Sequence, residues 1–534
     1  MGNEGKTSLE RAGSPEEVGV STSRIADFID DLKENEIETH SIMILRHGKV
    51  AFEAWAEPYG PDIPHTMYSV SKSVTSIAVG FAVEEGLLSL ESKVIDFFPE
   101  YAPDETDEKL EEMNIFHLLT MTAGKDVSQM TDKTKNQWVK DFFDAKWAFA
   151  PGEFWRYISE NTYMLSAILA RVTGKSLTEY LTSRLYEPLG YGRVPFWEKD
   201  GSGIEAGGWG LFLTTEELAK YILCCQQGGI FNGNRVIPAQ WIKQAGSKQV
   251  DNLQYTEPAA SIGYGYGMPM NPIPNSYRAD GLFSQFGLVF NDYDACLVMT
   301  ACEMFSRKTR DCFWRHFPEM FCQESDGVVP DEGLKDRLRL DALPDLPQTP
   351  RSQTEKIIDG KIFKIQKKRL LKGLGYPVGM FIMPVIQLNY EKLGNIEEIR
   401  FRFFENECSV TWRESLYKNT ITCGMDGKAR TEKIRLSQFN FTASSTAAWE
   451  DENTLNVWVR PLESIGQRRF KFVFNDGKVI LVPSSEPDMK SMMDFVSERV
   501  TLYVNEPLAI KAAQMVLSKA DKIIERKHKG RIEK

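Results

Sequence analysis

The chain has 534 residues, of which 42% are hydrophobic and 26% charged, as expected of a folded globular protein that is too long for one hydrophobic core. It carries 64 Lys and Arg against 75 Asp and Glu, and this net charge of −11 argues against nucleic acid as the main partner. Because no long apolar run and no apolar signal region occur, we expect no membrane partner and a cytoplasmic location.

The cysteines and histidines show no spacing typical of metal ligands. The 8 Cys include no Cys-x-x-Cys pair, and the vicinal Cys224 and Cys225 lie in an apolar run of helical periodicity. We therefore expect buried free thiols in a reducing compartment. The 6 His are scattered, so we predict no metal and no cofactor. We interpret His117 as a buried histidine that satisfies a backbone group rather than as a catalytic base.

The first predicted elements are a β-hairpin and a helix. Residues 41–45 and 50–55 are two short, mostly apolar runs joined by Arg46-His47-Gly48-Lys49, which predicts the hairpin. A helix follows, and Gly86 is its expected end. Its apolar residues recur at helical spacing; they are Val70, Val74, Ile77, Ala78, Phe81 and Ala82. At about 100° per residue, Ser69, Lys72 and Ser76 fall on a second face of this helix.

The Ser69 and Lys72 pair indicates nucleophilic catalysis. A Lys three residues after a Ser shares its helical face, and a Lys that has lost its proton can accept the proton of the hydroxyl, so that the Ser forms an acyl-enzyme. Roughly two such matches are expected by chance in a chain of this length. The second match, Ser415 to Lys418, lacks helical periodicity and is interpreted as coincidence. The alternative for the first is a capping Ser beside a Lys that reaches solvent.

Tyr157 and Ser159 form a second candidate group. The turn at Pro151-Gly152 leads to Tyr157 just before an amphipathic helix, residues 163–172, which Gly174 closes. A phenol beside a Lys can relay a proton to a leaving group, and the Ser159 hydroxyl can hold Lys72 or a substrate amide. The alternative is that Tyr157 belongs to an aromatic core cluster.

These motifs, in this order, resemble the serine β-lactamase-like hydrolases over about residues 15 to 320. This superfamily includes class C β-lactamases, D-alanyl-D-alanine carboxypeptidases, bacterial esterases and 6-aminohexanoate-dimer hydrolases. The motifs are Ser69-Val70-Ser71-Lys72, Gly86-Leu87-Leu88-Ser89-Leu90, His117-Leu118-Leu119-Thr120-Met121-Thr122-Ala123-Gly124, Pro151-Gly152 with Tyr157-x-Ser159, and Gly207-Gly208-Trp209-Gly210-Leu211 before Thr215-Glu216-Glu217-Leu218.

The resemblance implies an α+β fold of the β-lactamase/transpeptidase type, with an antiparallel sheet, flanking helices and an all-helical region. It implies that Ser69 is the nucleophile, Lys72 the base that activates it, and Tyr157 the acid or base at the leaving group. Members active on lactams or D-alanyl peptides usually carry Asn where this chain has Ser159. Ser at this position is typical of the branch that hydrolyses esters and amides.

The third motif of the superfamily, a basic residue or His followed by a small residue and Gly, is not recognisable. Residues 277–285 resemble its counterpart, because two predicted strands, 286–290 and 295–300, follow. If Gly281 supplies a close backbone approach, the N–H of Leu282 is the second oxyanion donor beside that of Ser69.

Counting without gaps from class C sequences points to Asp280 as that donor instead. Arg278 is a candidate to hold a substrate carboxylate in place of the missing Lys or His, although an Arg here is more often a surface ion-pair partner. Turnover of β-lactams or D-alanyl peptides is therefore in doubt.

The chain divides into a β-lactamase-like serine hydrolase domain at residues 1–325, an acidic, proline-punctuated linker at 326–356, and a β-rich domain at 357–534. Alternating segments and an Asn-Asp-Gly turn predict a small antiparallel sandwich or barrel that resembles the lipocalins. We expect it to end in a helix from about Pro507 to Lys527, followed by a frayed basic tail, 526–531. Its role is open: it walls the active site, dimerises or binds a partner.

Three functions remain. The first is a serine hydrolase that cleaves a small-molecule ester or amide through a Ser69 acyl-enzyme. The second is a D-alanyl-D-alanine carboxypeptidase or β-lactamase, and the third is a non-catalytic binding or scaffold protein on the same fold. A homo-oligomer stays open. The candidate pocket residues are aromatic and do not identify the acyl group; they are Trp155, Trp209, Tyr264 and Tyr266.

Overall fold

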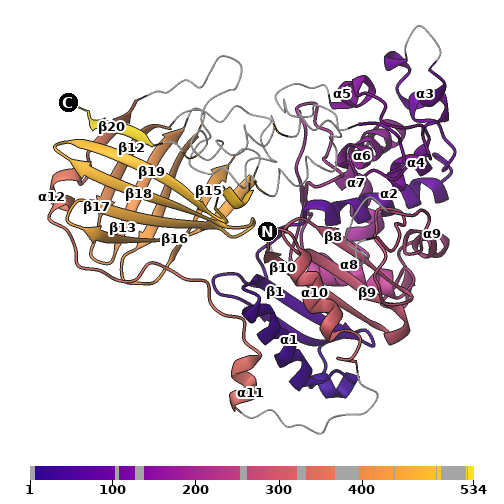
Figure 1. The fold of residues 1–534 in the computed structure, drawn as a ribbon, viewed down its shortest axis with the longest axis horizontal. Coiled ribbons are helices and arrows are strands. Elements are labelled where there is room, and N and C mark those ends of the chain that lie inside the picture. Colours follow the sequence, from indigo (N-terminus) through magenta and orange to yellow (C-terminus); the bar gives the residue numbers. More distant parts are fainter. Residues whose placement is uncertain are drawn as a thin grey trace. The chain divides into compact units, whose positions relative to one another are not determined.

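The computed structural model describes the chain except for residues 1–6, 103–106, 127–137, 253–260, 322–331, 367–395, 415–416, 437–438, 489, 493, 495–510, 512–524, 526 and 534. The chain forms two compact units, Met1–Asp341 (the first unit) and Ala342–Lys534 (the second unit) (Figure 1). The boundary between them falls inside the predicted linker. In the described part of the chain, no helix is both long enough and apolar enough to cross a membrane.

The first unit is built on a five-stranded antiparallel sheet in the order β2-β1-β10-β9-β8. Its strands are β1 (Glu38–Arg46), β2 (Lys49–Trp55), β8 (Ser276–Gly281), β9 (Gln285–Phe290) and β10 (Ala295–Cys302). The predicted hairpin is confirmed as β1 and β2, whose turn holds His47 and Gly48 at positive φ. The pairing of β1 with β10 joins the two ends of the unit.

Two hydrophobic cores cover the two faces of this sheet. Met43 and Leu45 of β1 enter one core, and Ile42 and Ile44 enter the other, because successive strand side chains point to opposite faces. The second core also contains α1 (Thr22–Glu34) and α10 (Arg307–His316). The first core contains α8 (Thr215–Gln226), which includes Cys224 and Cys225 and packs on β9 and β10.

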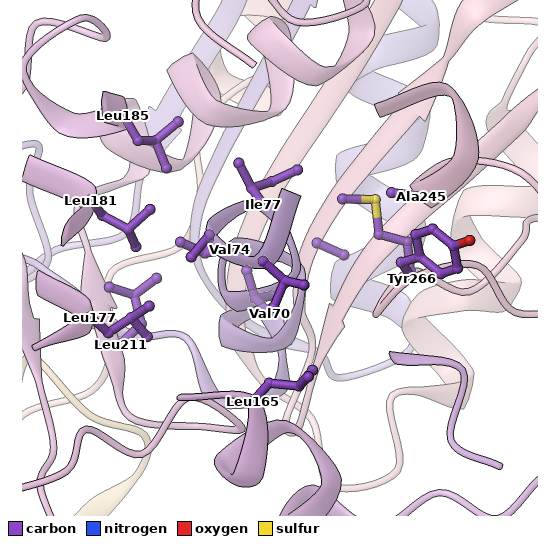
Figure 2. Packing of buried hydrophobic residues seen from close by; sticks show 14 of the residues in the cluster. Val70, Val74, Ile77, Leu165, Leu177, Leu181, Leu185, Leu211, Ala245 and Tyr266 are labelled. Atoms are coloured by element: carbon purple, nitrogen blue, oxygen red, sulfur yellow. The ribbon is translucent and has the colours of Figure 1, made fainter. Parts of the chain in front are cut away.

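The predicted helix is confirmed as α2 (Ser71–Glu84), preceded by one 3₁₀ turn, η2 (Tyr68–Val70). Figure 2 shows Val70, Val74 and Ile77 of this segment among side chains from several other elements. Every residue from Ser71 to Ala82 is buried, so the polar face with Lys72 turns into protein and not into solvent. Such a helix is core on all sides.

The remaining elements of the first unit are short apart from α6 (Ser159–Thr173), which packs against α2 and ends at Gly174. They are η1 (Pro15–Val18), β3 (His65–Thr66), η3 (Val94–Phe97), η4 (Pro99–Tyr101), α3 (Glu108–Glu112), α4 (Ile115–Leu119), α5 (Trp138–Asp144), α7 (Leu177–Leu181), η5 (Thr182–Tyr186), β4 (Phe196–Trp197), β5 (Leu211–Leu213), β6 (Ile230–Phe231), β7 (Asn234–Arg235), α9 (Ala239–Ala245), η7 (Asn291–Tyr293) and α11 (Glu332–Arg337).

The second unit is a ten-stranded sheet that curves round until β14 meets β16 at the pair Gly424 and Thr446. Alternate residues of its strands fill an apolar interior, which includes Phe401 and Phe472. After α12 (Thr354–Ile358) the strands are β11 (Ile362–Ile365), β12 (Ile396–Phe403), β13 (Glu407–Glu414), β14 (Tyr417–Gly424), β15 (Arg430–Leu436), β16 (Phe439–Asp451), β17 (Thr454–Pro461), β18 (Gln467–Asn475), β19 (Lys478–Glu486) and β20 (His528–Ile532). Lys418 of the second Ser-x-x-Lys match lies on β14, and Ser415 lies outside the described residues.

The prediction of a frayed C-terminal tail is wrong. Residues 528–532 form β20, which pairs with β11 on one side and β19 on the other. His528 and Gly530 point inward while Lys529 and Arg531 stay exposed, which is the alternation of a β-strand. The prediction missed this alternation because it considered only the basic composition of the segment. The helix expected from about Pro507 to Lys527 lies mostly outside the described residues.

Candidate active site

The segment that leads to Ser69 is fixed by backbone pairing. β3 pairs with β5, and the Met67 N–H donates to the Leu211 carbonyl at 2.8 Å. Tyr68 then adopts φ +45°, a left-handed conformation that costs a non-glycine residue about 1–3 kcal/mol. Its ring packs against Phe283. This sharp turn places Ser69 in η2, at the entry to α2.

Lys72 is the centre of the site. It is only 1% exposed, and its ammonium donates three hydrogen bonds. The acceptors are Ser69 Oγ at 2.8 Å, Ser159 Oγ at 3.1 Å and the carbonyl oxygen of Gly208 at 2.6 Å. Three elements far apart in sequence therefore converge on one nitrogen.

The chemistry of the three acceptors differs. The Gly208 carbonyl can only accept, so one N–H of Lys72 must point to it in either charge state. The hydroxyls of Ser69 and Ser159 can donate as well as accept. An uncharged Lys72 can therefore keep N–H bonds to Gly208 and Ser159 while its lone pair receives the proton of Ser69. The arrangement fits a base that is aimed at one hydroxyl.

Tyr157 lies beside Lys72, with Lys72 Nζ 4.8 Å from the centre of its ring. The ring is half-buried in a small aromatic cluster, where it contacts Trp155 at 6.0 Å and Tyr264 at 6.4 Å between ring centres. Met121 and the partly buried Val250 complete the cluster. Two of the candidate pocket aromatics thus support Tyr157.

Gly207 and Gly208 allow the turn before β5 to approach both α2 and α6 closely. A Cβ on Gly208 would lie 2.6 Å from the carbonyl oxygen of Ser159, closer than such atoms approach, and Thr75 Oγ1 donates to the Gly207 carbonyl at 2.8 Å. The sequence showed this glycine pair as part of a motif but not that the Gly208 carbonyl is a partner of Lys72. The pair of glycines was the signal that could have found it.

Gly281 ends β8 directly against the segment before Ser69. A Cβ there would lie 2.5 Å from the Met67 carbonyl oxygen, so this position requires glycine. Leu282 begins the turn to β9, in which Phe283 and Ser284 both have positive φ. The structure thus brings Gly281 and Leu282 to the η2 end of the site.

Arg278 does not fit the expectation that it holds a substrate carboxylate or makes a surface ion pair. It is 2% exposed and donates to Asp280 Oδ2 at 2.8 Å, to the Met270 carbonyl at 2.7 Å and to Asn271 Oδ1 at 3.2 Å. Its guanidinium is committed to internal acceptors because β8 directs it into the protein. Both expectations for Arg278, a substrate-binding role and a surface ion pair, are therefore wrong.

The contacts of His117 and of the cysteines indicate structural roles rather than catalytic ones. His117 Nδ1 accepts from the Asn114 N–H at the start of α4, and burial lowers the pKa of His117. The cysteines within the described residues are free thiols, and burial raises the pKa of Cys224 and of Cys312 to about 12. No group of three or more His, Cys, Asp or Glu in the described residues is arranged to hold a metal ion.

A cavity of about 240 Å³ lies on another side of α6, away from Ser69. Trp138, Tyr163 and Asp200 line it, and the Tyr163 hydroxyl donates to Asp200 Oδ2 at 2.7 Å. None of the residues around Lys72 lines this cavity. The candidate active site is therefore assigned from the polar contacts of Lys72 and not from this cavity.

The family model for Beta-lactamase matches residues 25–312, more than half of the chain. The chain belongs to this family. The resemblance predicted from the motifs is confirmed. The matched residues lie wholly in the first unit.

Several relatives match parts of the chain. It is 26% identical over 252 residues to 6-aminohexanoate-dimer hydrolase of Paenarthrobacter ureafaciens, which covers 43% of this chain and 63% of that protein. It is 27% identical over 192 residues to Esterase EstB of Burkholderia gladioli, covering 31% and 48%. The chain therefore spans less than two thirds of the length of these relatives.

A solved structure shows the same fold. A Bacillus anthracis protein described as a 6-aminohexanoate-dimer hydrolase superposes with a TM-score of 0.50 at 17% identity, covering 60% of this chain and 88% of that protein. The β-lactamase-like fold with mixed helices and strands is thus confirmed. The curved sheet of the second unit follows it in the chain.

Proposed function

We propose that this protein is a serine hydrolase that cleaves a small ester or amide through an acyl-enzyme on Ser69. The observation that carries the proposal is the buried Lys72 Nζ, held between Ser69 Oγ, Ser159 Oγ and the Gly208 carbonyl. A lysine that served only for packing would not need two hydroxyls as its partners. Membership of a family whose relatives are hydrolases supports the same conclusion.

The proposed reaction follows from the positions of the polar atoms. Ser69 Oγ attacks the substrate carbonyl carbon while its proton passes to Lys72 Nζ, and a tetrahedral oxyanion forms. The backbone N–H groups of Ser69 and Leu282 are the proposed donors to this oxyanion, each of which contributes about 3 kcal/mol of transition-state stabilisation.

The proton then leaves Lys72. With Tyr157 as the relay, it reaches the leaving alcohol or amine, the bond to the carbonyl carbon breaks, and the acyl group stays on Ser69. A water molecule attacks the acyl-enzyme in the second half of the reaction. Its proton follows the reverse path, and Ser69 leaves as a hydroxyl together with the free acid.

The proposed substrate class is small esters and amides rather than β-lactams or D-alanyl peptides. Ser159 replaces the Asn expected for the latter substrates, and Arg278 is bound to internal acceptors, so it does not replace the missing group that holds a substrate carboxylate. The relatives named above include both an esterase and a 6-aminohexanoate-dimer hydrolase.

A fluorophosphonate probe tests the proposal in one gel. The wild-type protein should be labelled covalently, and Ser69→Ala should not. Ser76→Ala is the matched control, since Ser76 is a buried serine one helical turn beyond Lys72 and should still allow labelling. Labelling that persists in Ser69→Ala would place the nucleophile elsewhere, and a wild-type protein without labelling or ester turnover would favour the non-catalytic alternative.

A further inference from the structure

The two units carry opposite net charge. The second unit has 32 Lys and Arg against 24 Asp and Glu, a net charge of +8, while the whole chain carries −11. The first unit therefore carries −19. An acidic chain thus contains one basic unit, and the overall charge that argued against polyanionic partners does not describe the second unit.

Part of this positive charge lies on one side of the curved sheet. The outward side chains of four neighbouring strands, β12, β11, β20 and β19, form what we call the basic face. Its cations are Arg400, Arg402, Lys364, Lys529, Arg531 and Lys478. The residues between them along each strand, such as Phe401 and Val479, are buried in the interior of the sheet. Four strands about 4.8 Å apart give the basic face a width close to 15 Å.

The strand register places like charges side by side. Arg531 of β20 lies directly opposite Lys364 of β11 and directly opposite Lys478 of β19. Like charges at directly opposite positions destabilise a sheet. Their presence on three strands in a row indicates that the surface serves a partner of negative charge.

Within the described residues, most of these cations have no carboxylate partner. Lys364 pairs with Glu398 at 2.8 Å and with Glu533 at 3.5 Å. For the other five cations, no carboxylate of the described residues lies within ion-pair distance, 4.0 Å. Their charge is thus available to an external anion.

Apolar side chains lie among these cations. Ile480, which is 36% exposed, is directly opposite Lys529 and Val473. The half-buried Ile362 is directly opposite Arg400. A surface that mixes cations with exposed aliphatic groups fits the boundary between lipid headgroups and acyl chains better than a sugar-phosphate backbone, which offers no apolar partner.

We propose that the basic face docks the protein on a membrane surface that contains anionic phospholipid. The cations bind the headgroups, whereas the acidic first unit is repelled by the same charges. The expectation of no membrane partner rested on the absence of a spanning segment, which surface docking does not need.

The test is cosedimentation of the full-length protein with vesicles. We expect binding to vesicles of phosphatidylcholine mixed with phosphatidylserine, no binding to phosphatidylcholine alone, and release at high salt because exposed charges are screened. The double variant Lys478→Glu and Arg531→Glu should lower the affinity at least about tenfold. Its rate on a soluble ester should stay unchanged, so this result is independent of the proposed hydrolase function.

The matched control is Lys418→Glu with Arg435→Glu, which makes the same change in net charge on β14 and β15. Both residues are exposed, and this variant should bind vesicles like the wild type. An equal loss in both variants, or equal binding to both kinds of vesicle, would overturn the proposal. Retention on double-stranded DNA that is lost only in Lys478→Glu with Arg531→Glu, without vesicle binding, would assign the basic face to nucleic acid instead.

Discussion

Two buried lysines in the first unit, Lys72 and Lys125, have the same burial and different surroundings. Lys72 is 1% exposed and Lys125 is 2% exposed. Lys125 Nζ donates to the carbonyls of Phe143 and Ala145 at 2.9 and 3.0 Å and lies 3.9 Å from the centre of the Trp147 ring. In the described residues its hydrogen-bond partners are carbonyls alone, whereas those of Lys72 include two hydroxyls.

The two lysines differ in whether their hydrogen-bond partners carry a proton that can be transferred. Burial lowers the pKa of Lys125 to about 8, so it can lose its proton near physiological pH. The acceptors of Lys125 in the described part of the chain are carbonyl oxygens, which carry no proton that Lys125 could take. A neighbouring aromatic ring and a lowered pKa are therefore not enough to make Lys125 a catalytic base. What distinguishes Lys72 is its contact with the hydroxyls of two serines.

The first and largest test of this comparison is on the reaction itself. Lys72→Arg keeps the charge but cannot lose its proton near neutrality, so turnover of a p-nitrophenyl ester should fall by about 10³-fold or more. Lys125→Met should stay within about threefold of the wild type, since it touches no reacting group. Steady-state rates with circular dichroism as a check on folding decide the matter, and an active Lys72→Arg would reduce Lys72 to a structural role.

The second test moves an acceptor of Lys72 without touching a side chain. Gly208→Ala would bring a Cβ within 2.6 Å of the Ser159 carbonyl oxygen, so the backbone must shift and the Gly208 carbonyl with it. We expect a loss of about 10- to 100-fold in kcat, because a displacement of about 1 Å in a catalytic group has such an effect. Gly60→Ala is the control, since its Cβ would meet nothing within 4 Å. Equal rates for the two variants would show that the Gly208 carbonyl does not position Lys72.

The third test uses the proton of Lys125. Its pKa is about 8 when folded and 10.5 in the unfolded chain, so between these values the unfolded state binds more protons and stability rises with pH. The free energy of unfolding of wild type minus that of Lys125→Met should therefore increase by about 1–3 kcal/mol from pH 7 to pH 10. Urea unfolding at the two pH values measures it, and a difference that falls or stays flat would show that burial does not destabilise the charged form.

Local patterns predicted the parts of the site that lie within one element. The spacing of Ser69 and Lys72 predicted a shared helical face, and the structure has Lys72 Nζ 2.8 Å from Ser69 Oγ. Two short apolar runs joined by a turn predicted the hairpin of β1 and β2. Such patterns succeed because a helix or hairpin fixes the geometry between near neighbours.

Contacts between segments that are distant in the chain could not be predicted from the sequence. The Gly208 carbonyl is 136 residues from Lys72, and no period relates the two. Arg278 looked like a surface residue because its internal acceptors, Asp280 apart, lie on the preceding loop, and β20 looked like a tail because its partner strands are remote in sequence. Packing decided each case, as it does wherever tertiary context overrides local preference.

The smallest expected effect concerns Ser159, which shares Lys72 with Ser69. A hydroxyl is shorter than the Asn side chain of lactam-cleaving relatives and leaves room for a bulkier acyl group, whereas an amide can both accept from Lys72 and donate to a substrate carbonyl. We expect the wild type to hydrolyse short-chain esters at least about tenfold faster than nitrocefin, a difference of about 1.4 kcal/mol in activation free energy. Ser159→Asn should narrow this ratio while Ser76→Ala leaves it unchanged. Equal wild-type rates on the two substrates would move the proposed substrate class to the lactams.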